Sequence, residues 1–454
     1  MSMHTAHLLR RTVAPVRAVH NAGRRWLPVV GFARLRNHLG AANVTAAPGI
    51  PGVVLPIVVF VFAVAVFAQG TSEFMVSGLL APIASDIGVS VGAAGLLTSL
   101  FAAGMVVGAP VMAMAAGRLP VRVATAAFLA LFCVAHVIGA VTTDFTVLLT
   151  TRVLAAVSNA GFLAIALAAL PRLIDPARLG RATSVVVSGV TVACIAGVPA
   201  GTLLGQIWGW RSAFWAVAVL SAVVLIPVWA LTGSDRAQQP ESPIRREWMV
   251  LGRSEIRTPV ALGVLVNAAT FAGFTYLGAI TAATGADERW IPLVLALFGL
   301  GSFAGVTLAG RYGDRYGRII IDTGTVALVA VWVLAAITAH TLAGVSALAV
   351  VTGAVAFGVG STLIATIVRT AAPSAPHIAG ALATTALNIG AVLGPALAGL
   401  VVDHTGRSTA ALWTSAVFTC AACVFPYATT AGSRLSSLRR APSRRPAGSA
   451  RTRK

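Results

Sequence analysis

The residues with the clearest chemical potential form a polar stretch inside an apolar run. The run extends from about residue 55 to residue 80 and holds one carboxylate, Glu73, accompanied by Gln69, Thr71, Ser72 and Ser77. A charged carboxylate near the middle of a bilayer costs about 3 kcal/mol or more, so it is tolerated where it faces a cavity, meets a partner or takes up a proton. Glu73 is therefore a candidate proton carrier, and the alternative is a hydrogen-bonded structural carboxylate.

Further polar side chains lie in the other apolar runs. In membrane helices such residues more often bond a neighbouring helix than a ligand. Together with Gln69 they are nevertheless the pool from which a small-molecule site would be drawn: His136, Asn159, Asn267, Tyr276 and Asn388.

The composition excludes a soluble protein. The chain of 454 residues is 57% hydrophobic and only 10% charged, whereas about a quarter of the residues of a soluble domain are charged. The formal net charge of +20 would suit nucleic-acid binding, but the basic residues lie between the apolar runs and at the termini. That distribution is typical of membrane topology, so we expect a lipid bilayer as a partner and no nucleic acid.

The apolar runs predict an all-α polytopic membrane protein, since about 20 helical residues cross ~30 Å of hydrocarbon. Twelve runs are long enough, at residues 55–80, 93–115, 122–142, 146–170, 181–205, 212–232, 259–282, 291–311, 319–339, 343–367, 378–401 and 408–429. A polar loop at 233–257 separates a six-helix half at 53–232 from another at 258–430. A basic tail follows at 431–454, and the acid-free extension at 1–52 suggests a disordered arm or a start codon assigned too early.

The arginines predict the orientation of these helices. If the N-terminus is cytoplasmic, the inner loops hold several clusters of arginine and the outer loops hold only Arg211, Arg289 and Arg407. Because cytoplasmic loops are enriched in Lys and Arg, we expect both termini in the cytoplasm and the chain in the inner membrane.

The sequence offers little for catalysis. It contains no nucleotide-binding P-loop and no convincing Ser/His/Asp arrangement or metal-ligand cluster. Cys420 and Cys423 form a C-x-x-C motif without a nearby His or second Cys pair, so packing is the simpler interpretation. We expect no enzyme activity, no cofactor and no metal.

The two halves repeat a pattern of Gly, Pro and Arg. Val198-Pro199 and Gly394-Pro395 each close the fifth run of their half, and Gly209-Trp210-Arg211-Ser212 and Thr405-Gly406-Arg407-Ser408 each precede the sixth. The offset between the copies is close to 196 or 197 residues each time, which predicts two halves of one topology. A substrate would then bind between them near the midplane of the membrane.

A loop motif resembles the major facilitator superfamily. Gly310 to Arg318 is similar to the family's G-x-x-x-D-R-x-G-R loop, and the first-half copy has Gly117 where the family has Asp. The resemblance implies that the loop charges latch neighbouring helices and take part in gating: Arg118, Asp314, Arg315 and Arg318. The alternative is that these charges only follow the enrichment of basic residues in cytoplasmic loops, but that enrichment does not account for an acidic residue at position 314. Asp322 could join the same network.

Two helix motifs extend the resemblance. Leu148 to Gly161 resembles the family's fourth-helix motif with a buried arginine, here Arg152, and Gly189 to Gly205, with Pro199, resembles the fifth-helix motif of drug:proton antiporters. The resemblance implies that Arg152 modulates proton release from the first helix and that Pro199 serves gating. The alternatives are an arginine that snorkels to a surface and a proline that serves helix bending and packing.

Over residues 53–430 the chain resembles the chloramphenicol exporters of actinobacteria, as in the stretches AVFAQGTSEFMVSGLL and GVPAGTLLGQIWGWRSAFWAV. The resemblance implies the major facilitator fold and proton-coupled efflux of chloramphenicol-like antibiotics by alternating access, with drug and protons as partners and a monomeric state. An exporter of another drug, a sugar or another metabolite would use the same machinery. A membrane sensor or scaffold would need neither Glu73 nor the loop around Asp314.

Overall fold

The computed structural model describes residues 55–115, 119–233, 249, 253–375 and 378–439, and the regular elements in these ranges are helices. Ten of the described helical segments are long and apolar enough to cross a membrane, and Ala410–Pro426 forms a shorter one. The segment Glu288–Thr338 has 51 residues, about twice the length that one crossing needs, so it counts as two spans. The predicted all-helical fold with twelve spans is confirmed. The predicted extension at 1–52, most of the central loop and Arg118 lie outside the described residues.

The first half contains α2 (Ile57–Ile87), α3 (Val91–Ala115), α4 (Val121–Val141), α5 (Phe145–Leu173), α6 (Leu179–Val192), α7 (Val198–Trp208) and α8 (Arg211–Leu231). A π-helical turn, Ala193–Gly197, joins α6 and α7 into one span, and the Val198 amide donates to the Ala193 carbonyl five residues back. This turn ends two residues before Pro199, which has no backbone N–H and whose ring would clash with a carbonyl in a regular helix. The wider turn therefore lets the span continue through the proline.

The second half contains α10 (Ser254–Thr275), α11 (Leu277–Ala283), α12 (Ile291–Thr338), α13 (Leu342–Ala371), α14 (Ala379–Thr405) and α15 (Ala410–Arg439). α12 holds both the eighth and the ninth predicted spans and leaves helical geometry at Tyr316 (φ −120°, ψ 16°). The expected loop between these spans is thus a short kink at Tyr316, where two separate helices meet. Residues 312–318, which connect the two spans, contain Gly313 and Gly317 but no proline, and each glycine weakens a helix by only about 1 kcal/mol.

Local sequence signals mark where several helices begin and end. The Asp144 carboxylate accepts a hydrogen bond from the Val147 amide at 2.8 Å and caps α5, and the Thr341 hydroxyl accepts one from the Gly344 amide and caps α13. α2 and α14 end at Gly88 (φ 77°) and Gly406 (φ 65°). Glycine adopts this left-handed conformation without the steric penalty of a side chain.

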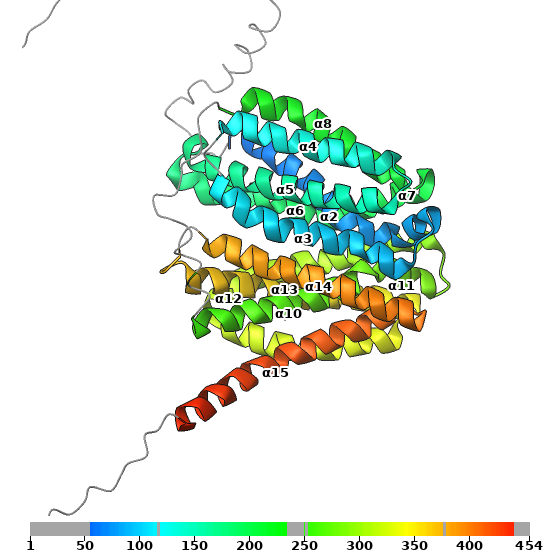
Figure 1. The fold of residues 1–454 in the computed structure, drawn as a ribbon, viewed down its shortest axis with the longest axis vertical. Coiled ribbons are helices and arrows are strands. Elements are labelled where there is room, and N and C mark those ends of the chain that lie inside the picture. Colours follow the sequence, from blue (N-terminus) through cyan, green and yellow to red (C-terminus); the bar gives the residue numbers. More distant parts are fainter. Residues whose placement is uncertain (1–54, 116–118, 234–248, 250–252, 376–377, 440–454) are drawn as a thin grey trace, which may run out of the picture. The chain divides into compact units, whose positions relative to one another are not determined.

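The two halves lie side by side, with α2 to α8 grouped on one side in Figure 1 and α10 to α15 on the other. The principal packing between them joins α3 to α14, α7 to α12 and α2 to α11. We call the end of the helices near Arg122, Arg178 and Arg315 the basic end. The other end, near Gly88 and Gly406, is called the opposite end.

The apolar core is shared between the halves only in part. The largest core cluster combines side chains of both halves, such as Phe74 and Leu79 with Phe271 and Leu295. Toward the basic end the halves have separate clusters: the first half has one that includes Leu170 and Val228 and a smaller one around Val121 and Ile165, and the second half has one that includes Ile367 and Leu382. The halves are therefore packed together toward the opposite end and have separate cores toward the basic end.

Candidate functional site

Glu73 lies on α2 between the buried side chains of Ser72 and Phe74. Its own side chain is half-buried. No residue in the described ranges forms a hydrogen bond or an ion pair with it. An unpaired charge in apolar surroundings is costly. The site must therefore either admit water to the Glu73 carboxyl group or hold that group neutral.

Arg152 lies on α5 and is only 1% exposed. Its Nη1 donates to the Ser72 hydroxyl and its Nη2 donates to the Ser72 carbonyl, both at 2.8 Å. The guanidinium also lies over the Phe101 ring of α3, 4.5 Å from the ring centroid. This side chain therefore turns into the protein and contacts the residue directly before Glu73, and it does not snorkel to a surface.

His136 of α4 completes this network. Its Nε2 lies 2.6 Å from the Ser72 hydroxyl oxygen and its Nδ1 lies 2.7 Å from the Phe132 carbonyl oxygen. Because a carbonyl oxygen only accepts, Nδ1 carries the hydrogen, and Nε2 of a neutral ring is then the acceptor for the Ser72 hydroxyl. A doubly charged pair of His136 and Arg152 would place two positive charges next to each other in the interior. The structure thus joins His136, which the sequence suggested as a drug ligand, to Ser72 and Arg152 across three helices.

Two buried polar groups beside this network have no partner in the described part of the chain. They are the Nε of Arg152 and both amide atoms of Gln69, whose side chain is fully buried. Gln69 lies one turn before Glu73 on α2, so both residues lie on the same side of that helix. Buried polar atoms are usually hydrogen-bonded, and these orphans are available to a bound molecule or water.

The other drug-site candidates lie apart from this network. Asn159 is buried on α5, about two turns after Arg152. The side-chain amides of Asn267 and Asn388 donate to the carbonyls of Leu387 and Thr384. The Tyr276 hydroxyl is a partner of two carbonyls, those of Pro395 at 3.0 Å and Gly92 at 3.3 Å.

An aromatic group lies between the halves directly after Glu73, and sequence reasoning missed it. Phe74 of α2 contacts Phe271 and Phe274 of α10, at ring centroid distances of 6.0 and 6.1 Å. Phe274 in turn stacks on Phe298 of α12 at 4.7 Å. Phe274 and Phe298 also line a pocket inside the second half, whose wall includes Trp332. These phenylalanines come from three helices that are far apart in the sequence, α2, α10 and α12, and their spacing along each run gave no signal of this contact.

The π-helical turn before Pro199 meets both halves near this group. A Cβ atom at Gly197 would collide with the Thr71 side chain of α2. A Cβ atom at Gly299 of α12 would come too close to the carbonyl of Cys194 in the turn. Glycine at these two positions thus allows α2, the π-helical turn and α12 to pack closely. Pro199, a gating candidate, lies two residues after the turn.

The charged residues around the α12 kink are exposed and pair within the second half. Asp314 pairs with Arg369 of α13 at 3.4 Å, and Arg318 pairs with Asp322 at 3.7 Å. The guanidinium of Arg315 lies 5.2 Å from the centroid of the Tyr316 ring. Asp322, which the sequence suggested could join the network of loop charges, thus pairs with Arg318, whereas Arg369 was not expected as the partner of Asp314.

Hydrogen bonds join the two halves at the opposite end. The Asp403 carboxylate of α14 accepts from the Ser90 hydroxyl at 2.7 Å and from the Gly92 amide at 2.9 Å, at the start of α3. In the reverse direction, the Gln206 amide of α7 donates to the Glu288 carbonyl, just before α12. These contacts close the opposite end in this conformation.

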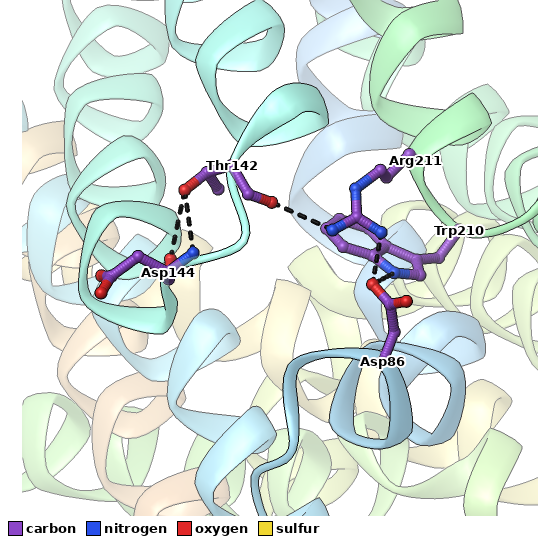
Figure 2. A network of polar contacts seen from close by, with 5 residues as sticks. All are labelled: Asp86, Thr142, Asp144, Trp210 and Arg211. Carbon is purple, nitrogen blue, oxygen red and sulfur yellow. Dashed lines mark hydrogen bonds and ion pairs between the residues drawn. The ribbon is translucent and has the colours of Figure 1, made fainter.

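A second polar network braces the first half at the same end (Figure 2). Arg211 at the start of α8 pairs with Asp86 near the end of α2, and the Trp210 indole donates to the same carboxylate at 3.1 Å. Arg211 also donates to the Thr142 carbonyl, between α4 and α5. Arg211 was predicted only as a loop charge, and the structure places it at the junction of three helix ends.

Comparisons with known proteins agree with this architecture. A family model of the Major Facilitator Superfamily matches residues 62–375 and 260–453. The chain is 44% identical over 381 residues to a chloramphenicol resistance protein of Streptomyces lividans, covering 83% of this chain and 97% of that protein. It is 29% identical to the inner membrane transport protein YdhP of Escherichia coli K12, covering 75% of this chain and 87% of that protein.

A solved structure has the same fold. The bacterial homolog of the human lysosomal transporter Spinster, in its inward-facing and unoccupied conformation, matches with a TM-score of 0.64 at 17% identity. The match covers 84% of this chain and 96% of that one. At this identity the likeness concerns the fold alone.

Proposed function

Since the chain belongs to the Major Facilitator Superfamily, we propose that it exports chloramphenicol-like antibiotics in exchange for protons. Membership of this family makes it a multi-pass membrane transporter and not an enzyme. In this proposal the protein lies in the bacterial inner membrane, with both termini in the cytoplasm. The 44% identity to a chloramphenicol resistance protein supports the substrate class. The aromatic group between the halves suits a drug that carries an aromatic ring, since aromatic rings attract one another in offset or edge-to-face arrangements.

The observation that carries the proton coupling is the relation between Glu73 and Arg152. Glu73 is a carboxyl group within a membrane span that has no partner among the described residues, and a buried guanidinium is bound to the residue before it. A carboxyl group of this kind exchanges a proton when its surroundings become open to water on one side of the membrane or the other. Uptake of the proton from outside and its release inside would each occur in only one orientation of the transporter.

The packing of the halves supports alternating access. The shared core and the bonds of Asp403 and Gln206 close the opposite end, while the cores toward the basic end are separate. With the basic end in the cytoplasm, this conformation opens inward, where Glu73 would release its proton and the drug would enter. Rocking of the halves then exposes the same residues to the outside.

The test is Glu73→Gln, which mimics a permanently protonated side chain. The variant should insert normally, because an amide is less costly to bury than a charge, and it should lose active export because the proton cannot leave. Cells that express the full chain are given labelled chloramphenicol with and without a protonophore. Wild-type cells should accumulate less drug until the protonophore is added, and Glu73→Gln cells should show no such difference.

The matched control is Glu255→Gln, the same chemical change at an exposed position in the first turn of α10, which should export normally. Protonophore-sensitive exclusion by Glu73→Gln cells with normal protein levels would rule out Glu73 as the coupling site. A drug-susceptibility panel tests the substrate. If cells resist other compounds but not chloramphenicol-like drugs, the chain exports another small solute by the same machinery.

A further inference from the structure

We propose that Ser72 and His136 form a neutral docking site for the guanidinium of Arg152, which holds that charge beside Glu73 without pairing the two. Both would be positioning residues for proton exchange. The inference rests on the proposed role of Glu73 as the proton carrier.

The hydrogen bonds of the docking site run in one direction. Arg152 donates to the Ser72 hydroxyl and carbonyl, the Ser72 hydroxyl donates to His136, and His136 donates to the Phe132 carbonyl. A hydroxyl group has one hydrogen and two lone pairs. When the Ser72 hydroxyl donates its hydrogen bond to His136, a lone pair of the hydroxyl oxygen is left to accept from the guanidinium. His136 therefore acts on Arg152 through Ser72.

The ring of His136 is itself held in place. It lies 4.2 Å from the Phe132 ring and 5.9 Å from the Phe214 ring of α8, measured between centroids, and the side chain is 1% exposed. Its Nδ1 bond to the Phe132 carbonyl fixes which nitrogen carries the hydrogen. The docking site thus contains a rigid, uncharged acceptor, the Nε2 of His136, for the hydroxyl of Ser72.

Within the described residues, the docked guanidinium forms no ion pair. Its partners are the two neutral oxygens of Ser72 and the face of Phe101, and its Nε has no acceptor in the described ranges. A buried charge without a counter-ion is unfavourable. Glu73, which also has no bonding partner in the part of the chain that the structure describes, is the neighbour of Ser72 in the sequence, so the arrangement suits a neutral, protonated Glu73.

Loss of the proton would change this balance. When the Glu73 O–H bond breaks and the proton passes to water, the carboxylate becomes a stronger acceptor than the Ser72 hydroxyl, because bonds between charged partners are about twice as strong as neutral ones. The free Nε–H of Arg152 would then serve Glu73. When a proton returns to the carboxylate, the Nε–H bond to Glu73 weakens and the guanidinium is again held by Ser72 alone. The docking site keeps Arg152 from holding Glu73 permanently deprotonated.

Ser72→Ala and His136→Phe remove the hydroxyl and its acceptor, and they test this role. Purified full-length protein in proteoliposomes is assayed for export of labelled chloramphenicol driven by a pH gradient. It is also assayed for exchange of labelled against unlabelled drug without a gradient, which needs no net proton movement. Both variants should lose about tenfold or more of proton-driven export, as expected when a bond to a charged group is lost, and should keep exchange. His136→Gln, whose side chain can still accept from Ser72, should recover export.

Ser221→Ala is the matched control, since Ser221 is fully buried in α8 and its hydroxyl donates only to the Val217 carbonyl of the same helix. Normal export by Ser72→Ala and His136→Phe, with export lost in Glu73→Gln, would overturn the docking site and leave the proposed function standing. Loss of exchange together with export would assign these residues to drug binding or folding and also overturn it. Normal export by Glu73→Gln would overturn both proposals.

Discussion

At the scale of single residues, the most unusual side chain is Arg152. A fully buried arginine generally has a carboxylate partner, because a buried charge left uncompensated is strongly destabilising. Here the guanidinium uses its planar, forked donors to reach two oxygens of one residue, Ser72, while the Phe101 ring covers its face. Shape as well as charge therefore determines what can occupy this position.

Arg152→Lys should lose most of the export activity although it keeps the positive charge. An ammonium group is a point charge and cannot reproduce two parallel bonds of a planar guanidinium, so we expect about a tenfold loss, the value of one bond to a charged group. The measurement is the initial rate of chloramphenicol export at equal protein levels. Arg289→Lys, at an exposed arginine, is the control. Export at the wild-type rate by Arg152→Lys would show that charge alone is needed.

At the scale of helices, the contacts that close the opposite end follow the internal repeat. Asp403 and Gln206 each lie three residues before the glycine with positive φ that ends their helix, Gly406 in α14 and Gly209 in α7. Each bonds to the segment that begins the second span of the other half. The sequence repeat around Gly209 and Gly406 could have indicated these two residues, because equivalent positions of two related halves meet across their pseudo-twofold axis.

Asp403→Ala should weaken closure of the opposite end. It removes the acceptor for Ser90 and Gly92, and for an exposed carboxylate we expect a loss of about 1 kcal/mol, or about fivefold in the equilibrium between the two orientations. Spin labels at the exposed positions Ser85 and Arg407, in a background without the native cysteines, would report the distance between the halves. The population with a longer distance should increase. Asp322→Ala, which affects a pair within α12, should leave the distances unchanged.

At the scale of the whole molecule, the sequence predicted the helices much better than the contacts between them. Spans could be predicted because bilayer thickness sets their length, and Glu73 and Arg152 stood out because charges are rare in apolar runs. The bonds from Ser72 to His136 and Arg152 join residues 64 and 80 positions apart. No periodicity along one helix specifies which side chain of another helix it meets. For the same reason, the bonds of Tyr276 to two backbone carbonyls could not be foreseen.

Glu73 is the one acidic residue well inside a predicted span, and this number determines how much charge the transport cycle moves. Chloramphenicol is uncharged, so the exchange of one proton for one drug molecule moves one net charge across the membrane. Membrane potential alone should then drive transport, at about 2.3 kcal/mol per charge per 100 mV. A potential of about 60 mV corresponds to about 1.4 kcal/mol, or about a tenfold drug gradient at equilibrium. The combined force of about 150 mV in a cell would support a gradient of up to about 300-fold.

Proteoliposomes with equal pH on both sides and an interior-positive potential of about 60 mV, set by potassium and valinomycin, should therefore accumulate labelled chloramphenicol. Protons leave down the potential while drug enters, and this equilibrium is independent of how the protein is oriented in the vesicle. About tenfold accumulation indicates one proton per drug, and about a hundredfold would require a second proton carrier, because each charge contributes one factor of ten. Glu73→Gln vesicles should show no accumulation. If wild-type vesicles also fail to respond to the potential but respond to a pH gradient, a compensating charge moves with the drug and Glu73 is not the sole charge carrier of the cycle.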